Sequence, residues 1–194
     1  MTARVSPGCI RDTGLLVHAF ARLAGRAAGT SPPAVFLTLG RNRRLFWGWL
    51  FFAGALMPGG RLPRRETELV ILRVATLSRS AYELTQHRRL GLRAGLTADE
   101  IDRIALGPGD PSWGPRDRVL LRVADALHAK GDVSDGLWTE LRALLDERET
   151  IELVMLVGHY TMLATALNTL RVEPDRPRRL TSDSIALRRG DRPS

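Results

Sequence analysis

The chain has 194 residues, enough for one domain with a sizeable core, and carries a formal net charge of +8. Lys130 is the only lysine, and the arginines are spread along the chain instead of being grouped with aromatic residues, which argues against nucleic-acid binding. Cys9 is the only cysteine, so the sequence excludes an internal disulfide, a Cys-x-x-Cys redox pair and a cysteine-based zinc cluster, and a reducing cytoplasm fits.

The first third of the chain predicts helices. Residues 13–28 form an amphipathic pattern, and a short helix follows Ser31-Pro32-Pro33. Residues 42–57 form the most apolar helix. Its apolar run of 13 residues is too short for a bilayer, which needs about 20, so a core helix or an oligomer interface is the better interpretation. The N-terminus lacks the residue order of a signal peptide, and we expect a cytoplasmic protein.

The remaining elements are also helical, and no segment alternates apolar and polar residues as a strand would. Thr97 and Glu100 form a capping box, and Ser134 is a helix cap. The expected helices cover residues 64–77, 80–92, 97–106, 115–130, 135–146 and 149–170. We therefore predict an all-α protein with eight or nine helices and no sheet. It comprises an N-terminal helical arm over 1–30, a domain over 31–172 with its core at 62–106, and a flexible Pro- and Arg-rich tail over 173–194.

Four polar residues stand at spacings of 12, 3 and 4: Glu68, Ser80, Glu83 and His87. The last three share one face of a helix, and Glu68 lies on a preceding helix that can fold back against them. Two carboxylates and a histidine at one point indicate proton-transfer chemistry. Two other interpretations remain open, a solvated Glu83–His87 pair and a metal site completed by Glu68 and His159.

Polar residues elsewhere could complete such a site. His159 and Tyr160 interrupt the otherwise apolar helix 149–170, where they either hydrogen-bond within the core or point into the same pocket. Arg73 and Arg79 flank the four residues and could bind a substrate carboxylate through the guanidinium fork.

The segment LPRRETELVILRVATLSRSAYELTQHRRLGLRAGLTADEID resembles the core of the carboxymuconolactone decarboxylase family, which belongs to the alkylhydroperoxidase D-like superfamily. The resemblance implies an all-α fold that assembles into trimers or hexamers. In the peroxidase branch of that superfamily the site is similar to Glu-x11-Cys-x2-Cys-x3-His. Glu68 and His87 match the outer residues here, while Ser80 and Glu83 stand in place of the two cysteines and Tyr82 replaces a histidine.

Thiol–disulfide exchange needs two thiols, so a peroxidase role is not expected. The Tyr-Glu-x-x-x-His form resembles the decarboxylase branch, whose substrates are small carboxylated lactones. We therefore hypothesise a cofactor-independent lyase-like enzyme, without a metal, that acts on a small carboxylate or lactone by decarboxylation, isomerisation, dehydration or lactone opening. Glu83 or His87 would move the proton, Glu68 would orient His87, and Ser80 and Tyr82 would hydrogen-bond developing charge. The alternative is a non-catalytic helical protein of the same fold that binds a ligand or serves in assembly.

Overall fold

The computed structural model describes residues 2–176, which form ten helices and no strand. The all-α prediction is confirmed. The count exceeds the prediction because α1 is an isolated turn of four residues, too short to show a helical period. The helices are α1 (Ile10–Thr13), α2 (Leu15–Ala28), α3 (Ala34–Leu39), α4 (Arg43–Leu56), α5 (Arg64–Leu77), α6 (Ala81–Arg93), α7 (Ala98–Ile104), α8 (Pro115–Lys130), α9 (Asp135–Arg142) and α10 (Glu147–Leu170).

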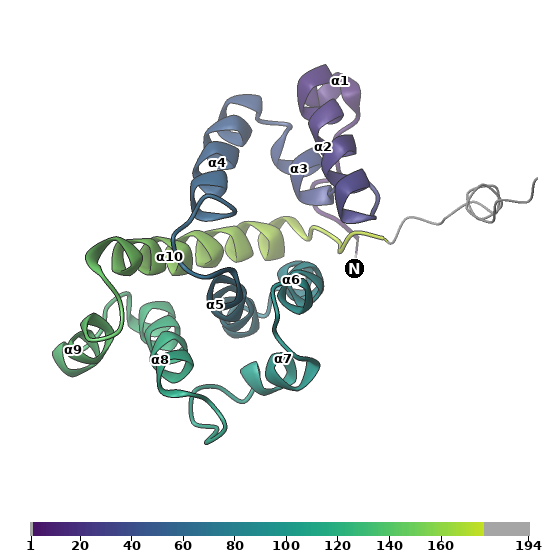
Figure 1. The fold of residues 1–194 in the computed structure, drawn as a ribbon. Helices are drawn as coiled ribbons and strands as arrows, with labels where there is room; N and C mark the ends of the chain where they lie inside the picture. Colours follow the sequence, from purple (N-terminus) through teal and green to yellow (C-terminus); the bar gives the residue numbers. More distant parts are fainter. Residues whose placement is uncertain (1, 177–194) are drawn as a thin grey trace, which may run out of the picture.

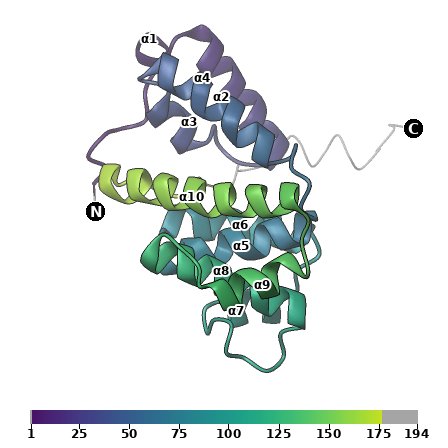
Figure 2. The same ribbon diagram turned by 90° about the vertical axis from the view of Figure 1, so that its left-hand side faces the viewer.

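Helix α10 crosses the middle of the molecule and separates two groups of helices. Figures 1 and 2 show α1–α4 on one side of it and α5–α9 on the other. By length and composition α10 could span a membrane, but half of its most apolar stretch is buried in the fold. That placement is consistent with the core helix of a soluble protein.

Local capping explains several helix boundaries. The predicted capping box of α7 is present, with Thr97 accepting from the Glu100 amide and Glu100 accepting from the Thr97 amide. Helix α10 begins two residues earlier than predicted because Asp146 and Glu149 form a second capping box.

Helix α5 is the most enclosed element, with every residue from Thr67 to Ala75 buried. Its exposed first turn is tied to its neighbours by ion pairs. Arg65 pairs with Asp117 of α8 at 2.9 Å and with Glu100 of α7. Because α5 is surrounded by α6, α8 and α10, any polar side chain on its buried stretch must find a partner inside the protein.

A cluster of aromatic rings joins α2, α3 and α4 on the other side of α10. The ring centroids of Phe20, Phe36, Phe46, Trp47 and Trp49 lie 5.1 to 6.2 Å from one another in the contacting pairs. Tilted and edge-on contacts at these distances are favourable for aromatic pairs. This cluster shapes the side of the molecule that faces α6.

The segment after α10 returns to the body of the protein through Asp175. Its carboxylate accepts from the Tyr82 hydroxyl at 2.8 Å, the Ala34 amide at 2.7 Å and Gln86 Nε2 at 3.0 Å. The first four residues of the predicted flexible tail, 173–176, therefore form a segment that is docked on the body of the protein through Asp175. The rest of that prediction, residues 177–194, lies outside the described residues.

One face of α10 exposes an apolar stripe formed by Ile151, Val154, Met155 and Met162. Met162 also borders a surface hollow with Leu45 and Gly48 of α4, so the stripe continues onto that helix. Exposed apolar surface that runs over two helices is typical of a protein interface.

We propose that this stripe is covered by a second copy of the chain in the predicted homotrimer or homohexamer. Replacing Met155 and Met162 together with glutamate places charges in the interface, and we expect the particle to dissociate to smaller species in light scattering at micromolar concentration. Leu106→Glu, at an exposed apolar residue after α7, is the matched control and should leave the mass unchanged. A wild-type protein that scatters as a monomer would contradict the proposal.

Candidate active site

Glu68 and His87 form the centre of the site. Glu68, on α5, is completely buried, and its Oε2 lies 2.7 Å from Nδ1 of His87 on α6. Its other oxygen lies 2.7 Å from Nη2 of Arg64, one turn earlier on α5. An ionised carboxylate can only accept hydrogen bonds, so the proton of His87 is on Nδ1 and the lone pair is on Nε2. The structure therefore brings together Glu68 and His87, as the spacing predicts.

Glu83 lies one turn before His87 on the same face of α6, with Ser80 at the N-cap of that helix. Both Glu83 oxygens are buried, and neither has a hydrogen-bond partner among the described residues. Burial raises the pKa of Glu83 from its ordinary value of 4.5 to about 8, with a smaller opposing effect from the Ser80 hydroxyl. At neutral pH this side chain is therefore a carboxylic acid able to donate a proton.

His159 and Tyr160 bring α10 to the same place. The Tyr160 ring meets the His87 ring edge-on at 5.1 Å, and the His159 ring stacks on Trp49 at 6.2 Å. Burial, with a smaller effect of His87, lowers the pKa of His159 to about 4, so its imidazole is neutral near pH 7. Burial raises the pKa of the Tyr160 hydroxyl, which therefore stays protonated. His159 and Tyr160 therefore line the same cavity as Glu83 and His87, which is one of the two placements that the sequence left open.

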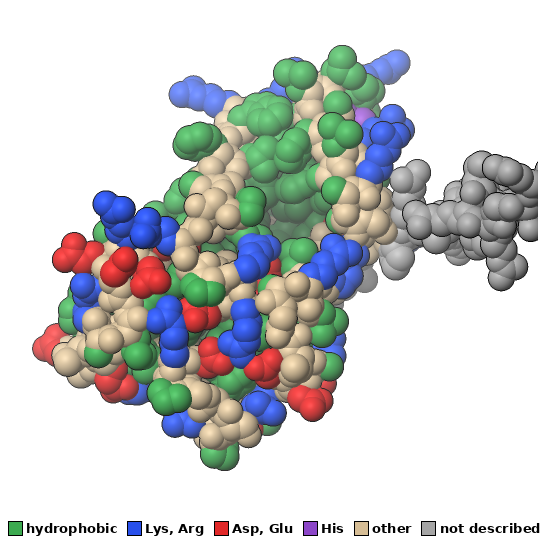
Figure 3. All heavy atoms as spheres, viewed as in Figure 1, with side chains coloured by type: hydrophobic (Ala, Val, Ile, Leu, Met, Phe, Trp, Pro, Cys, Tyr) green, Lys and Arg blue, Asp and Glu red, His purple; other side chains and the backbone are tan. Residues whose placement is uncertain are grey.

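A cavity of about 460 Å³ lies between α6, α10 and the helices α2–α4. Glu83, His87, His159 and Tyr160 all line it. Its walls are mostly apolar, and Figure 3 shows hydrophobic side chains along the hollow between α4 and α2. The volume is in the range of small-molecule sites.

Arg73, which we expected to bind substrate, does not line the cavity. Its guanidinium pairs with Asp125 of α8 at 2.6 and 2.9 Å and donates to the Ile104 carbonyl at 2.9 Å. Gly107, with φ +90°, passes so close that an added Cβ would lie 2.9 Å from Arg73 Nη2. Arg73 follows Glu68 by five residues, which turns it about 140° around the helix, away from the site.

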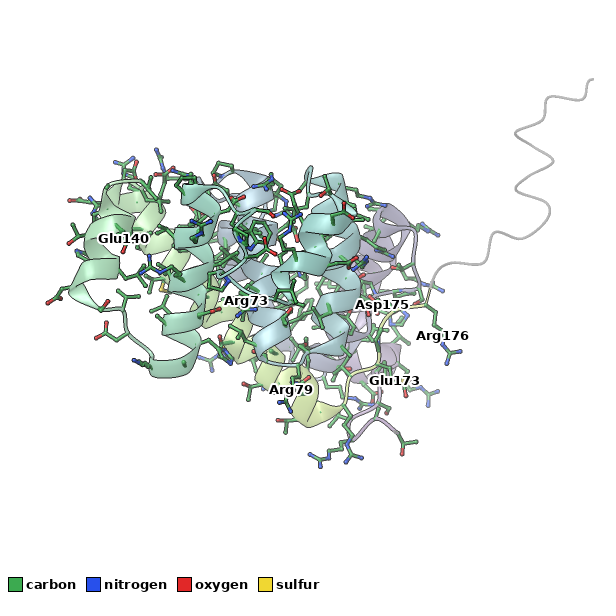
Figure 4. All side chains as sticks on the ribbon, turned by 90° about the horizontal axis from the view of Figure 1, so that it is seen from below. Arg73, Arg79, Glu140, Glu173, Asp175 and Arg176 are labelled. Carbon is green, nitrogen blue, oxygen red and sulfur yellow. The ribbon has the colours of Figure 1, made fainter. Side chains whose placement is uncertain are left out.

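Arg79 and Tyr82 also differ from expectation. Arg79 has φ +51° in the turn between α5 and α6, its side chain is exposed, and it does not line the cavity. Arg73, Arg79 and Asp175 lie well apart in Figure 4. Tyr82 lines the cavity, but its hydroxyl donates to Asp175. That hydrogen bond holds the docked segment, so the hydroxyl is not free to donate to a substrate oxygen.

Sequence reasoning missed Arg64, Gln86 and Asp175. Arg64 could have been found, because a cation four residues before a buried carboxylate is a common helical pair. Gln86 stands on the cavity face of α6 and donates to Asp175. No local pattern indicates that contact, since Asp175 is 89 residues away.

A metal site was the open alternative for these residues. Within residues 2–176 no group of three or more His, Cys, Asp or Glu side chains is placed to hold a metal ion. His159 in particular turns its ring onto Trp49 and Phe52.

Residues 43–126 match the model of the carboxymuconolactone decarboxylase family. A comparison with curated proteins finds no match. Among solved structures, the chain is similar to an uncharacterized peroxidase-related protein with an alkylhydroperoxidase AhpD core from Ralstonia eutropha JMP134. That similarity has a TM-score of 0.76 at 19% identity, over 88% of this chain and 92% of that chain.

Two further structures share the fold. An uncharacterized peroxidase-related protein from Silicibacter sp. TM1040 has a TM-score of 0.74 at 15% identity, over 82% of this chain and 84% of that one. A Cys-to-Ala variant of the debrominase Bmp8, in complex with 2,3,4-tribromopyrrole, has a TM-score of 0.75 at 14% identity over 89% and 92%. At these identities the structures show the AhpD-like helical fold alone.

The raised pKa of Glu83 makes stability depend on pH. Between about pH 4.5 and 8 the unfolded chain loses the Glu83 proton while the folded chain keeps it, so wild-type stability falls by at most about 1.4 kcal/mol per pH unit. Glu83→Gln does not ionise and avoids this loss. We expect the variant to gain stability relative to wild type as pH rises from 5 to 8, measured by urea unfolding. A difference that is constant with pH would contradict the assignment.

The contacts of Arg73 predict a structural role. Arg73→Leu removes the partner of Asp125 and of two carbonyl groups, and we expect it to lower the free energy of unfolding by about 3 kcal/mol in urea titrations. Arg79→Gln, at an exposed arginine of the next turn, should change it by less than about 0.5 kcal/mol. Equal urea midpoints for Arg73→Leu and wild type would restore Arg73 as a candidate for binding substrate.

Proposed function

We propose that this chain, which belongs to the carboxymuconolactone decarboxylase family through residues 43–126, is a cofactor-independent enzyme that transfers protons on a small substrate held in the cavity. The observation that carries the proposal is that one helix, α6, presents a proton donor and a proton acceptor to the same cavity. Glu83 is an acid in its protonated form, and one turn later His87 has its tautomer set by Glu68.

His87 is the base. Because Nδ1–H donates to Glu68, Nε2 is the nitrogen that can accept a proton from a substrate in the cavity. When Nε2 accepts, the imidazolium charge is balanced by the Glu68 carboxylate 2.7 Å away. Glu68 is thus a positioning residue that also stabilises the charged state, as the third group of a catalytic triad does.

Glu83 is the acid. Its carboxyl group is buried beside the cavity without a protein partner among the described residues, so its O–H is available to a substrate oxygen. A neutral carboxylic acid in an apolar site donates a strong hydrogen bond and can transfer the proton as negative charge develops. Ser80, at the start of the same helix, lies beside Glu83 and limits the rise in its pKa.

The open cavity argues against a non-catalytic assembly protein. An acid and a base that both face it favour an enzyme over a protein that only binds a ligand. A fold that kept these residues as structural remnants could fill the space with nearby large side chains. Trp47 instead packs in the aromatic cluster, and Leu84 packs with the core on the other side of α6, while Glu83 and His87 face the cavity. Decarboxylation, isomerisation and lactone opening can all use a proton donor and a proton acceptor. The pair therefore supports proton transfer in general and does not select one of these reactions.

Removing either proton-transfer group should abolish most of the activity. We expect His87→Gln and Glu83→Gln to lower turnover by about 10²–10⁴-fold, and Glu68→Gln by a smaller factor since it acts through His87. Activity is followed as exchange of substrate C–H for deuterium in D2O, by NMR, over a panel of small lactones, ketones and carboxylates.

Arg79→Gln is the control for this series, because Arg79 is outside the cavity, and it should exchange at the wild-type rate. Circular dichroism of each variant shows whether it is folded. A loss of less than about tenfold in folded His87→Gln would overturn the role of His87.

A further inference from the structure

The geometry points to a substrate that is an uncharged, largely apolar carbonyl compound, such as an unsaturated lactone or cyclic ketone, whose double bond is moved by a 1,3-proton shift. This inference rests on the proposed function and names its substrate class and reaction. It follows from the charges, the walls and the hydrogen-bonding groups of the cavity, taken in turn.

The cavity offers no fixed positive charge to an anion. Among the described residues that line it, none is lysine or arginine. Both arginines expected to bind a carboxylate are elsewhere, Arg73 with Asp125 and Arg79 in the exposed turn. Arg64 is already paired with Glu68. A carboxylate in this cavity would lose its hydration without gaining a lysine or arginine partner among the described residues, which is unfavourable.

Among the lining groups that could still meet an anion, His159 and Glu83 do not compensate, and His87 is needed in its neutral form as the base. His159 is neutral, because burial lowers its pKa to about 4. Glu83 is neutral only while it keeps its proton, and a second carboxylate beside it would repel the charge that forms when the proton is transferred. The proton-donating role of Glu83 and an anionic substrate are therefore in conflict.

The walls suit a flat apolar molecule. Aromatic side chains of Phe36, Trp49 and Tyr160 line the cavity, together with Met57 and Leu163. Burying an apolar ring against these side chains is favourable by the hydrophobic effect, and aromatic walls add specific contacts to a planar ring. The polar lining groups come from α6, where Glu83 and His87 stand one turn apart, and from His159 and Tyr160 of α10.

A 1,3-proton shift uses both groups and needs no co-reactant. His87 Nε2 removes a proton from the carbon between the carbonyl group and the double bond. The C–H electron pair becomes a new carbon–carbon double bond, and the carbonyl electrons move to oxygen, which takes the Glu83 proton. The resulting dienol returns the O–H proton to the Glu83 carboxylate, while the imidazolium delivers its proton to the far carbon. Atoms and charges balance, and both residues return to their starting states.

The test compares two compounds that differ in charge at one position. One is a β,γ-unsaturated butenolide with a methyl substituent on its ring, and the other is the same ring with a carboxymethyl group in place of the methyl. Dissociation constants are measured by calorimetry with the full chain, and conversion to the α,β-unsaturated isomer is followed by NMR in D2O. We expect the neutral ring to bind at least about tenfold more tightly than the anionic one and to isomerise. The far carbon gains either the proton removed from the substrate or deuterium that has exchanged onto the imidazolium before delivery.

The outcomes separate this inference from the proposed function. Tighter binding or faster conversion of the carboxymethyl ring would overturn the substrate class, while a loss of that conversion in His87→Gln would still support the proton-transfer function. Preferential binding of the neutral ring without conversion would support the substrate class for binding and overturn the 1,3-shift. Preferential binding with conversion unaffected in folded His87→Gln would overturn the proposed function.

A substitution in the cavity gives a second readout. Leu50 lines the cavity and is only partly buried, so Leu50→Arg can place a cation there. We expect it to tighten binding of the carboxymethyl ring at least about tenfold, with Leu50→Gln as the uncharged control that leaves the preference for the neutral ring in place. No change in Leu50→Arg, with the chain folded, would mean that lack of a cation is not what excludes anions. The wild-type comparison stands without either variant.

Discussion

The complete burial of the Glu68 carboxylate constrains everything around it. A carboxylate on the most enclosed helix is tolerated only where hydrogen bonds or opposite charges replace water, and here His87 and Arg64 serve its two oxygens. To keep Nδ1 of His87 at 2.7 Å, α6 must lie against α5 in one rotation about its own axis. That rotation also turns Glu83, four residues earlier, to the cavity. One buried contact therefore orients both the proposed base and the proposed acid.

Two glutamates perform different tasks in this site because their surroundings differ. Glu68 is held by a histidine and an arginine, whereas the oxygens of Glu83 have no partner in the described part of the chain. Pairing keeps the first able to balance an imidazolium, and burial keeps the second protonated near neutral pH. The division needs no difference in residue type. It follows from the positions of the two side chains, one between helices and the other at the wall of a cavity. Enzymes that use paired carboxylates distinguish them in the same way.

Local features of the chain were predictable, and distant contacts were not. Helices α5 and α8 have the predicted bounds, because their apolar periods and adjoining proline and serine residues are signals within one segment. The Glu68, Glu83 and His87 positions also follow from spacing on two consecutive helices. The docking of Asp175 on Tyr82 joins residues 93 positions apart, and no pattern in either segment encodes it. The position of Arg73 was predictable only in part. A helical wheel already places it away from Glu68, but only the fold reveals Asp125 as its partner.

Resemblance to a family transfers some properties of a site more safely than others. The spacing of Glu68 and His87 depends on the packing of α5 against α6, which the shared fold preserves, so those positions carry over. The charge that recognises a substrate depends on single side chains around the cavity, which can change without affecting that packing. Here the family resemblance suggests carboxylated substrates, yet the arginines that the sequence offers are used for helix contacts or stand in an exposed turn. Glu83 and His87 thus face a mostly apolar cavity, which is why we propose substrates that enter it without a charge.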